Sequence, residues 1–297
     1  MSPVFPMKAL QALLPLAFAE DEGSGDITSE ATIESDHRSH AVLLCKEDGI
    51  LAGSPIVEAV FRYRGLAPRV EWLVGEGESI KAGMTMARMD GETKGLLLCE
   101  RIILNFLQRL CGIASVTHTY VEAVGSKTKI LDTRKTLPAY RLLDKYAVAL
   151  GGGTNHRQGL FDQVLIKDNH AMACGSVLGA VHKVATRFTR GYIIEAEVRN
   201  LEELESLLNS QVNIILLDNM SNEVLRQAVQ RVKTKAPHIR LEASGGMSLD
   251  RVRQLRDMGL DFISVGALTH SVNALDLSLK ITQSELGLAG LGYSHGS

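Results

Sequence analysis

The sequence predicts an α/β protein in which a parallel sheet, connected by crossover helices, follows a mixed N-terminal part. From about residue 127 onward, six apolar strand patterns alternate with six helical patterns. An open doubly wound sheet and a barrel both fit this alternation. No strand is followed by the GxGxxG pattern of a dinucleotide-binding turn, and polar residues gather at the carboxyl ends of the strands. We therefore favour a barrel.

Composition and charge narrow the class of protein. The 297 residues suffice for one large domain or two of ordinary size, and 45% apolar with 22% charged residues is typical of a soluble globular protein. A net charge of −2 gives no argument for nucleic-acid binding, so an anion site would be a local patch. Four scattered cysteines indicate a reduced, cytoplasmic protein. No run approaches the ~18 apolar residues of a membrane span, so no membrane partner is expected.

The N-terminal part combines helices with short strands. Leu10, Leu13, Leu14 and Phe18 follow one face of a helix, which we interpret as packed rather than as a signal peptide. A strand is then expected at 40–48, a helix at 54–63, a strand at 69–74 and short strands between glycine turns at 75–91.

A long amphipathic helix should separate the two parts, beginning with Thr93 as its N-cap, ending near Val124 and breaking near Gly112. After it, apolar patterns predict strands at 129–132, 162–166, 192–198, 213–218, 239–244 and 261–266. The expected helices between and after them lie at 140–150, 175–188, 201–210, 221–232, 248–259 and around 274–286.

Each of these strands ends in a charged residue, a hydroxyl or a glycine. A cap or a turn explains any one such feature, whereas six of them at the same end favour a site, because barrel enzymes place their chemistry there. The residues concerned are Thr133, Arg134 and Lys135, then Lys167, Asp168, Asn169 and His170, then Glu197, then Asp218 and Asn219, then Ser244, Gly245 and Gly246, and finally Gly266, Thr269 and His270.

The polar residues differ in kind along the chain. Residues 127–170 hold eight lysines or arginines against four aspartates, a local positive surplus. The glycine turns at 244–246 and 266 suit a phosphate, because backbone N–H groups can approach its oxygens there. Glu197 and Asp218 suit Mg²⁺, sugar hydroxyls or a developing positive charge. The pattern indicates a phosphorylated sugar as one substrate and a second anion as the other.

At this level of detail a family resemblance can be named. The chain resembles the quinolinate phosphoribosyltransferases, also called nicotinate-nucleotide pyrophosphorylases, in order and spacing over nearly its whole length. The resemblance rests on LDTRKTLP (131–138), GGGTNHRQGLFDQVLIKDNH (151–170), EAEV (195–198), LLDN (216–219), EASGG (242–246) and ISVGALTHS (263–271). It extends to 25–28, 100–115 and 274–281.

The resemblance implies a fold and an assembly. The fold is an N-terminal open α/β sandwich at 1–115 and an incomplete, seven-stranded TIM-like α/β barrel at 116–274. A C-terminal helix at about 275–297 could pack back on the sandwich, and a seventh strand is expected within 133–160. Members form homodimers or larger homo-oligomers with shared active sites, so Arg101 would reach the site of the neighbouring subunit.

The implied activity is transfer of the phosphoribosyl group from phosphoribosyl pyrophosphate to quinolinate. The products are nicotinate mononucleotide, pyrophosphate and CO₂, in de novo NAD biosynthesis. Mg²⁺ is required and no organic cofactor. Once the ring nitrogen carries the ribosyl group, the cationic ring can accept the electrons that the departing carboxylate releases.

Matched positions imply the site residues. Lys135, Lys167, Glu197 and Asp218 would be catalytic, with Glu197 and Asp218 as candidate Mg²⁺ ligands acting through substrate and water. Arg101, Arg134, Lys135, His156, Arg157 and Lys167 would bind quinolinate and pyrophosphate. Glu197, Asp218, Ser244, Gly245, Gly246, Gly266 and His270 would bind ribose and phosphate. Arg141, Asp168 and Asn169 would lie behind these residues, and the glycines at 151–153 would bend the chain to aim His156 and Arg157.

Three alternatives stay open. One is a class I aldolase-like barrel with Lys167 as Schiff-base nucleophile, which would not need so many other cations. The second is a nicotinate phosphoribosyltransferase-like enzyme, although six cations suit a dicarboxylate better than a monocarboxylate. The third is a non-catalytic anion-binding paralogue, against which the intact motifs at 133–135, 155–157, 167–169, 195–197 and 217–219 argue.

Overall fold

The computed structural model describes residues 3–188 and 191–282, which form two compact units. Unit 1 takes its described residues from Met1–Ser115, Leu142–Leu150 and Val272–Ser297, and unit 2 takes its residues from Val116–Arg141 and Gly151–Ser271. Residues 142–150 thus belong to unit 1, although the neighbouring strands in the sequence belong to unit 2. The domain boundaries expected from the sequence stay a prediction.

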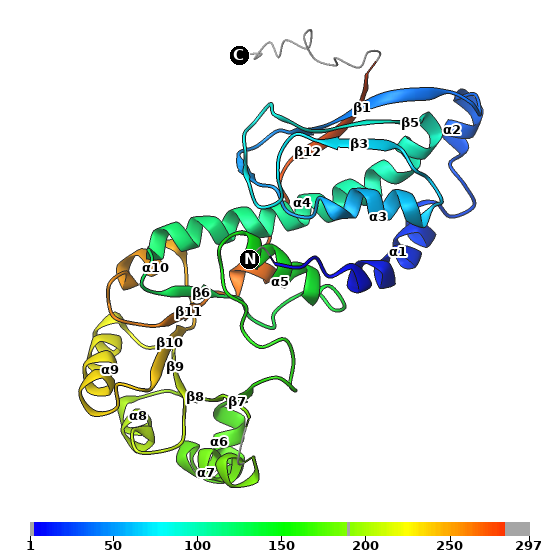
Figure 1. Ribbon diagram of the computed structural model, residues 1–297. Helices are drawn as coiled ribbons and strands as arrows, with labels where there is room; N and C mark the ends of the chain where they lie inside the picture. Colours follow the sequence, from blue (N-terminus) through cyan, green and yellow to red (C-terminus); the bar gives the residue numbers. More distant parts are fainter. Residues whose placement is uncertain (1–2, 189–190, 283–297) are drawn as a thin grey trace. The chain divides into compact units, whose positions relative to one another are not determined.

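Unit 1 is built on an antiparallel sheet with the strand order β12-β1-β5-β3. These strands are β1 (Arg38–Cys45), β3 (Arg69–Trp72), β5 (Thr85–Glu92) and β12 (Leu277–Thr282), and a two-stranded ladder joins β2 (Gly49–Ile50) to β4 (Ser79–Ile80). The helices are α1 (Met7–Asp21), α2 (Ile27–Thr32), α3 (Pro55–Tyr63), the first part of α4 (Thr93–Val124) and nearly all of α5 (Arg141–Leu150). Helices α3 and α4 run along one face of the sheet (Figure 1).

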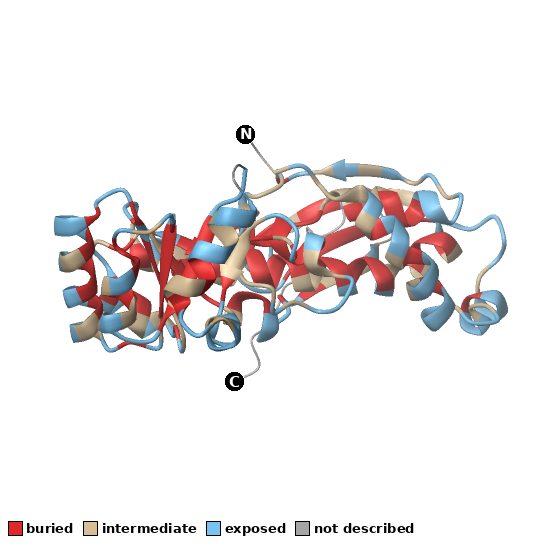
Figure 2. Cartoon of the chain, turned by 90° about the horizontal axis from the view of Figure 1, so that it is seen from below, coloured by how far each residue is buried: buried red, intermediate tan, exposed pale blue. Residues whose placement is uncertain are grey.

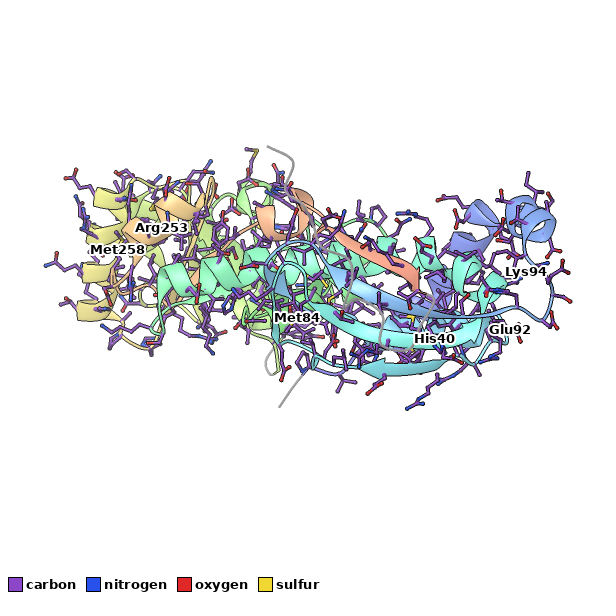
Figure 3. All side chains as sticks on the ribbon, turned by 90° about the horizontal axis from the view of Figure 1, so that it is seen from above. His40, Met84, Glu92, Lys94, Arg253 and Met258 are labelled. Atoms are coloured by element: carbon purple, nitrogen blue, oxygen red, sulfur yellow. The ribbon has the colours of Figure 1, made fainter. Side chains whose placement is uncertain are left out.

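The core of unit 1 lies between this sheet and its helices. Val60 and Phe61 of α3 and Leu107 of α4 are inaccessible to solvent or nearly so, as is Leu43 of β1. In Figure 2 the buried residues lie on the inner sides of the helices, and exposed residues lie on their outer sides. Figure 3 shows the side chains of both units, with His40 on β1 of unit 1 labelled.

The C-terminal helix expected at about 275–297 is wrong over the part that the structure describes. Leu277–Thr282 is the strand β12, antiparallel to β1, with Leu277 opposite Cys45 and Leu279 opposite Leu43. Leu277 and Leu279 are buried, while Ser278 and Lys280, which alternate with them, are partly exposed. This period of two is that of a strand, and the pairing partner lies more than 230 residues earlier in the chain. The rest of the expected helix, 283–297, lies outside the described residues.

The predicted break near Gly112 is also wrong, because α4 is one continuous helix of 32 residues. A Cβ atom on Gly112 would collide with the carbonyl oxygen of Asn273. The glycine therefore permits a close approach of two backbones inside unit 1 and does not interrupt the helix.

Unit 2 contains a six-stranded, all-parallel sheet with the order β6-β11-β10-β9-β8-β7. Its strands are β6 (Lys129–Leu131), β7 (Val164–Ile166), β8 (Ile194–Val198), β9 (Ile214–Asp218), β10 (Arg240–Ser244) and β11 (Phe262–Ser264). Its helices include α6 (Asp168–Cys174), α7 (Val177–Arg187), α8 (Leu201–Leu207), α9 (Asn222–Lys235), α10 (Leu249–Leu255) and α11 (Ala267–His270). Helix α6 is not among the helices expected from the sequence, because its short polar start resembles a loop. The order confirms the wound, barrel-like α/β class.

A seventh strand was expected within 133–160, and only a single bridge occupies its place. Thr154 bridges to Leu131 in the parallel sense, with Thr154 N–H donating to Ile130 O at 2.8 Å and Asp132 N–H donating to Thr154 O at 3.3 Å. The described part of unit 2 thus has six strands and a one-residue bridge at the outer edge of β6. Three glycines precede Thr154, and glycine has little tendency to extend a strand.

Among the described residues, no helix combines the length and the apolarity that crossing a membrane requires.

Candidate active site

The carboxyl ends of the unit 2 strands surround a cavity of about 920 Å³. Parallel strands all deliver their following loops to the same edge, so residues far apart in the sequence meet there. Every site residue predicted within unit 2 lines this cavity: Arg134, Lys135, His156, Arg157, Lys167, Glu197, Asp218, Ser244, Gly245, Gly246, Gly266 and His270. The remaining predicted residue, Arg101, is an exposed residue of α4 in unit 1.

One wall of the cavity is cationic. Arg157 is only 8% exposed, and burial, followed by the charge of Arg134, lowers the pKa of its guanidinium. The Nε atom of Arg134 is buried without a hydrogen-bond partner in the described structure. Two guanidinium groups held this close, one with an unused donor, form a strong site for carboxylates.

Arg141 holds this cationic wall in shape. Its guanidinium donates to Thr136 Oγ1 at 3.1 Å, to the main-chain oxygen of Gln158 at 3.0 Å and to that of Arg134 at 3.4 Å. The loop after β6 is thereby tied to the loop before β7. In the structure Arg141 supports the wall from behind.

Two carboxylates face the cavity from neighbouring strands. Glu197 lies in β8 and Asp218 ends β9, and burial, followed by the charge of Asp218, raises the pKa of Glu197. Lys167 Nζ lies 3.8 Å from Glu197 Oε2. Mg²⁺ prefers hard oxygen ligands, and a cation between these two acids would relieve their mutual repulsion. The donor set therefore fits Mg²⁺.

The glycine turn after β10 has the backbone geometry expected for a close approach to a ligand. Gly245 and Gly246 have φ angles of +91° and +56°, the left-handed region that favours glycine. A Cβ atom on Gly245 would also collide with the side chain of Asn219. Arg251 donates to Gly245 O at 2.9 Å and to Met220 O at 2.6 Å, which ties the turn to the loop after β9.

Gly266, after β11, is a glycine for a different reason. Its φ angle is not positive, but a Cβ atom there would lie 3.1 Å from the ring of His270 and 3.3 Å from Lys135 Cδ. The missing side chain leaves room for the side chains of His270 and Lys135 at this side of the cavity.

Comparison with known proteins assigns the family. Residues 26–111 match the model of the N-terminal domain of quinolinate phosphoribosyl transferase, and residues 113–280 match the model of its C-terminal domain. The chain belongs to the quinolinate phosphoribosyltransferase family. A chloroplastic nicotinate-nucleotide pyrophosphorylase of Arabidopsis thaliana is 40% identical over 96% of this chain and 86% of its own length.

Solved structures of this family support the same assignment. The nicotinate-nucleotide pyrophosphorylase of Francisella tularensis superposes with a TM-score of 0.87 at 36% identity, covering 95% of this chain and 98% of that one. NadC from Streptococcus pyogenes gives a TM-score of 0.89 at 36% identity, covering 95% of this chain and 100% of that one. The expected fold, an open α/β sandwich and an incomplete TIM-like barrel, is therefore that of this family.

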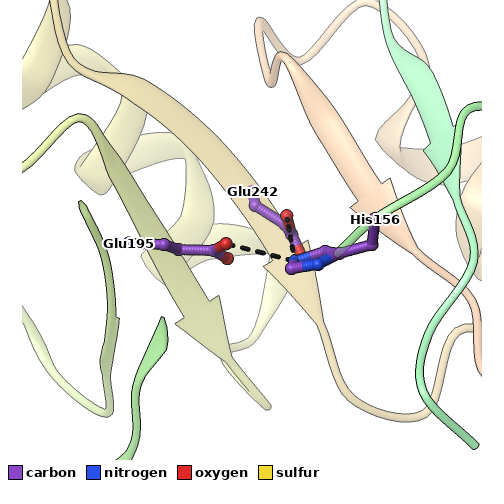
Figure 4. A group of neighbouring side chains, drawn as sticks. All are labelled: His156, Glu195 and Glu242. Carbon is purple, nitrogen blue, oxygen red and sulfur yellow. Dashed lines mark ion pairs between the residues drawn. The ribbon is translucent and has the colours of Figure 1, made fainter. Parts of the chain in front are cut away.

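Two buried carboxylates were not expected from the sequence: Glu242, which lines the cavity, and Glu195, which lies behind His156. His156 Nε2 lies 3.1 Å from Glu195 Oε2 and 3.7 Å from Glu242 Oε2, and the two glutamate side chains are 0% and 1% exposed (Figure 4). A signal was present: each glutamate interrupts an apolar strand pattern, and Glu195 shares the strand face of Glu197, two residues later. Asp132, also fully buried, accepts from the main-chain N–H of His156 at 2.8 Å.

Burial disfavours the charged form of both glutamates. Burial raises the pKa of Glu195 to about 7, and burial together with the charge of Glu195 raises that of Glu242 to about 8. Glu195 Oε1 and Glu242 Oε2 have no hydrogen-bond partner among the described residues. Ser264 Oγ donates to the other oxygen of Glu242.

Proposed function

We propose that this protein transfers the phosphoribosyl group of phosphoribosyl pyrophosphate to quinolinate and removes one carboxylate, giving nicotinate mononucleotide, pyrophosphate and CO₂ in de novo NAD biosynthesis. One observation carries the proposal. A single cavity joins a cationic wall, a pair of carboxylates and a glycine turn, which are the partners that a pyridine dicarboxylate, a ribose and a 5′-phosphate require.

Arg134, Arg157 and Lys167 bind quinolinate in this proposal. The planar guanidinium groups can each hold a carboxylate through two hydrogen bonds, while a lysine acts as a compact charge. Lys135 lies where the pyrophosphate would leave, beside the space that Gly266 keeps open. The buried location of Arg157 strengthens its attraction for an anion because little water competes there.

Glu197 and Asp218 hold Mg²⁺ and the ribose hydroxyls. When bound, the metal ion supplies charge neutralisation at the leaving pyrophosphate. As the bond from the anomeric carbon to pyrophosphate lengthens, positive charge develops on the ribose ring, and the same two carboxylates stabilise it. Ser244, Gly245, Gly246 and His270 hold the 5′-phosphate, with Ser244 on the strand next to that of Asp218.

Decarboxylation then needs little from the protein beyond orientation. The ribosylated ring nitrogen is cationic, so the electron pair released when the adjacent C–C bond breaks is stabilised on the ring, and a proton replaces CO₂. The arginines keep the reacting carboxylate out of bulk water, which favours the loss of its charge.

We also propose a homodimer or larger assembly in which Arg101 completes the site of a neighbouring subunit, and a cytoplasmic location. Support for the assembly comes from the exposure of Arg101 outside unit 2 and from the family resemblance. Mixed Arg101→Ala and Arg157→Ala subunits should recover part of the activity that each variant lacks. No recovery after demonstrated subunit exchange would contradict shared sites.

The experiment for the activity combines purified protein, quinolinate, phosphoribosyl pyrophosphate and Mg²⁺. We expect one CO₂ for each nicotinate mononucleotide formed. Nicotinate, tested in parallel, separates this function from that of a nicotinate phosphoribosyltransferase, because it lacks the second carboxylate. No release of CO₂ with any divalent metal ion would refute the proposed function.

A further inference from the structure

Both ring nitrogens of His156 have defined partners. The main-chain N–H of Arg157 donates to Nδ1 at 2.7 Å, and a main-chain N–H can only be a donor. Nδ1 is therefore the unprotonated nitrogen, and the ring proton lies on Nε2. Nε2 in turn is 3.1 Å from Glu195 Oε2, which accepts this proton in a hydrogen bond.

These bonds belong to a closed ring of hydrogen bonds. Glu195 Oε2 also accepts from Gln163 Nε2 at 2.6 Å, and the main-chain oxygen of Gln163 accepts from Arg157 Nη1 at 3.4 Å. The ring runs from Glu195 through His156 and Arg157 to Gln163 and back. It holds both ends of Arg157, its main-chain nitrogen and its guanidinium group, and Glu195 is the only carboxylate among its four members.

A metal ion is the competing explanation for this cluster. Ligand atoms of His156, Glu195 and Glu242 lie within 4.8 Å of one another, close enough for one ion. A metal at Nε2 would need the lone pair of that nitrogen. Because Nδ1 already accepts from Arg157, the lone pair is at Nδ1, and Nε2 offers a proton instead. The hydrogen bonds therefore favour a positioning role.

We propose that Glu195 is a positioning residue: it keeps His156 in the Nε2–H form and, through the hydrogen-bond ring, aims the Arg157 guanidinium at the carboxylates of the pyridine substrate. The inference deepens the proposed function and rests on it for the identity of the substrate. Glu195 does not contact the substrate itself. Its effect should therefore fall on the affinity for the dicarboxylate and spare that for phosphoribosyl pyrophosphate.

One test does not depend on turnover. The nitrogen-15 NMR signals of His156, assigned by their loss in His156→Asn, should show at neutral pH a protonated Nε2 and an unprotonated Nδ1. A protonated Nδ1, in either the other neutral tautomer or the imidazolium form, would overturn the proposal. This result stands even if the protein does not act on quinolinate, so failure of the proposed function is seen separately.

The kinetic test uses Glu195→Gln, which keeps the shape of the side chain but replaces the carboxylate by a neutral amide and so removes the charge that strengthens both accepted hydrogen bonds. We expect the KM for quinolinate to rise about tenfold, the effect of one charge-assisted hydrogen bond. The KM for phosphoribosyl pyrophosphate should stay within about twofold. An equal rise of both KM values, or no change in either, would contradict a positioning role.

Gln163→Met provides a second variant that does not depend on the folding of Glu195→Gln. It removes the donor to Glu195 and leaves the main-chain oxygen that accepts from Arg157. We expect the same selective rise in the KM for quinolinate. In the double variant, the rise in this KM should be smaller than the product of the two single-variant rises, because both changes break the same hydrogen-bond ring. Independent effects that multiply would argue against the ring.

Glu242→Gln is the matched control. Glu242 is as deeply buried as Glu195 and contacts the same histidine at 3.7 Å, but it is not a member of the ring. We expect it to change the ratio of the two KM values less than Glu195→Gln does. An equal or larger change would assign the effect to the buried charges in general and overturn the specific role of Glu195.

Discussion

Each unit contains buried carboxylates, and the two sets differ in how their charges are compensated. In unit 1, Asp144 is fully buried and receives a bidentate pair from Arg109, at 2.9 and 2.8 Å. In unit 2, Glu195 and Glu242 each retain a buried oxygen without a hydrogen-bond donor in the described structure, and the pKa values of both are raised.

The difference separates a structural role from a functional one. A buried acid that is paired through both oxygens stabilises the fold once its partner is present, and removing the partner leaves a buried charge. Acids that are incompletely paired and lie beside a cavity are typical of sites that bind charged ligands. The comparison predicts that changes in unit 1 affect stability first and that changes around the cavity affect activity first.

The largest expected effect on stability comes from Arg109→Ala. It removes the bidentate partner of the fully buried Asp144, so we expect the free energy of unfolding to fall by about 3–5 kcal/mol. Denaturant unfolding measures this change. Arg109→Lys keeps the positive charge but loses the bidentate geometry, and it should fall between the wild type and Arg109→Ala. A fall in the free energy of unfolding of less than about 1 kcal/mol in Arg109→Ala would contradict a structural role for the Arg109–Asp144 pair.

Glu197→Gln should reduce activity strongly and stability only slightly, the reverse of Arg109→Ala. We expect kcat to fall about 10²–10³-fold, as when one preorganised electrostatic group is lost from an active site, with a change in stability below about 1 kcal/mol. Steady-state kinetics and thermal unfolding on one preparation measure both. Glu202→Gln, an exposed carboxylate on α8, is the matched control and should leave kcat unchanged. Loss of stability without loss of kcat would show that Glu197 is structural.

Gly245→Ala tests the glycine turn. The positive φ angle and the collision with Asn219 should displace the turn, so we expect about a tenfold higher KM for phosphoribosyl pyrophosphate and a smaller effect on quinolinate. Gly175→Ala carries the same backbone strain, with a φ angle of +85°, but a Cβ atom there has nothing within 4 Å. If the two variants have the same KM values, strain alone explains the result and the turn holds no phosphate.

The smallest expected effect is that of Glu242 on how the stability of the protein changes with pH. The pKa of Glu242 is raised from 4.5 to about 8, so between these values the folded protein keeps a proton that the unfolded chain has released. The contribution to stability is fully present below the lower value and is lost as the pH rises through the upper one. Glu242→Gln should therefore flatten the decline of stability toward alkaline pH, measured by unfolding at a series of pH values.

Glu205→Gln is the control for the pH series. A hydrogen bond from Lys235 lowers the pKa of this partly exposed group, so its contribution is present at neutral pH and is lost as the pH falls. The variant should alter the acid side of the profile and leave the alkaline side as in the wild type. An alkaline decline that persists unchanged in Glu242→Gln would show that another group titrates there.

Local patterns explain most of what the sequence predicted well. The six parallel strands were found because buried strands are short apolar runs between turns, and this signal needs no knowledge of the partner strand. The residues at their carboxyl ends were found because parallel strands deliver their ends to one edge. Predictions that depend on a distant partner are less accurate. The local pattern at β12 predicts a helix, because the six β1 residues that pair with β12 lie far away in the chain.

The sequence by itself thus determined the family, the α/β class and the cavity residues from Arg134 to His270, since each depends on residue type and local periodicity. Tertiary structure alone decided that the helix continues through Gly112, which lies against the carbonyl group of Asn273, and that residues 142–150 join unit 1. It alone also brought Glu195, Gln163, His156 and Arg157 into one hydrogen-bond ring. The physical reason is that a hydrogen bond or a collision depends on the distance between two atoms in space, and a linear pattern does not contain that distance when the residues come from different strands.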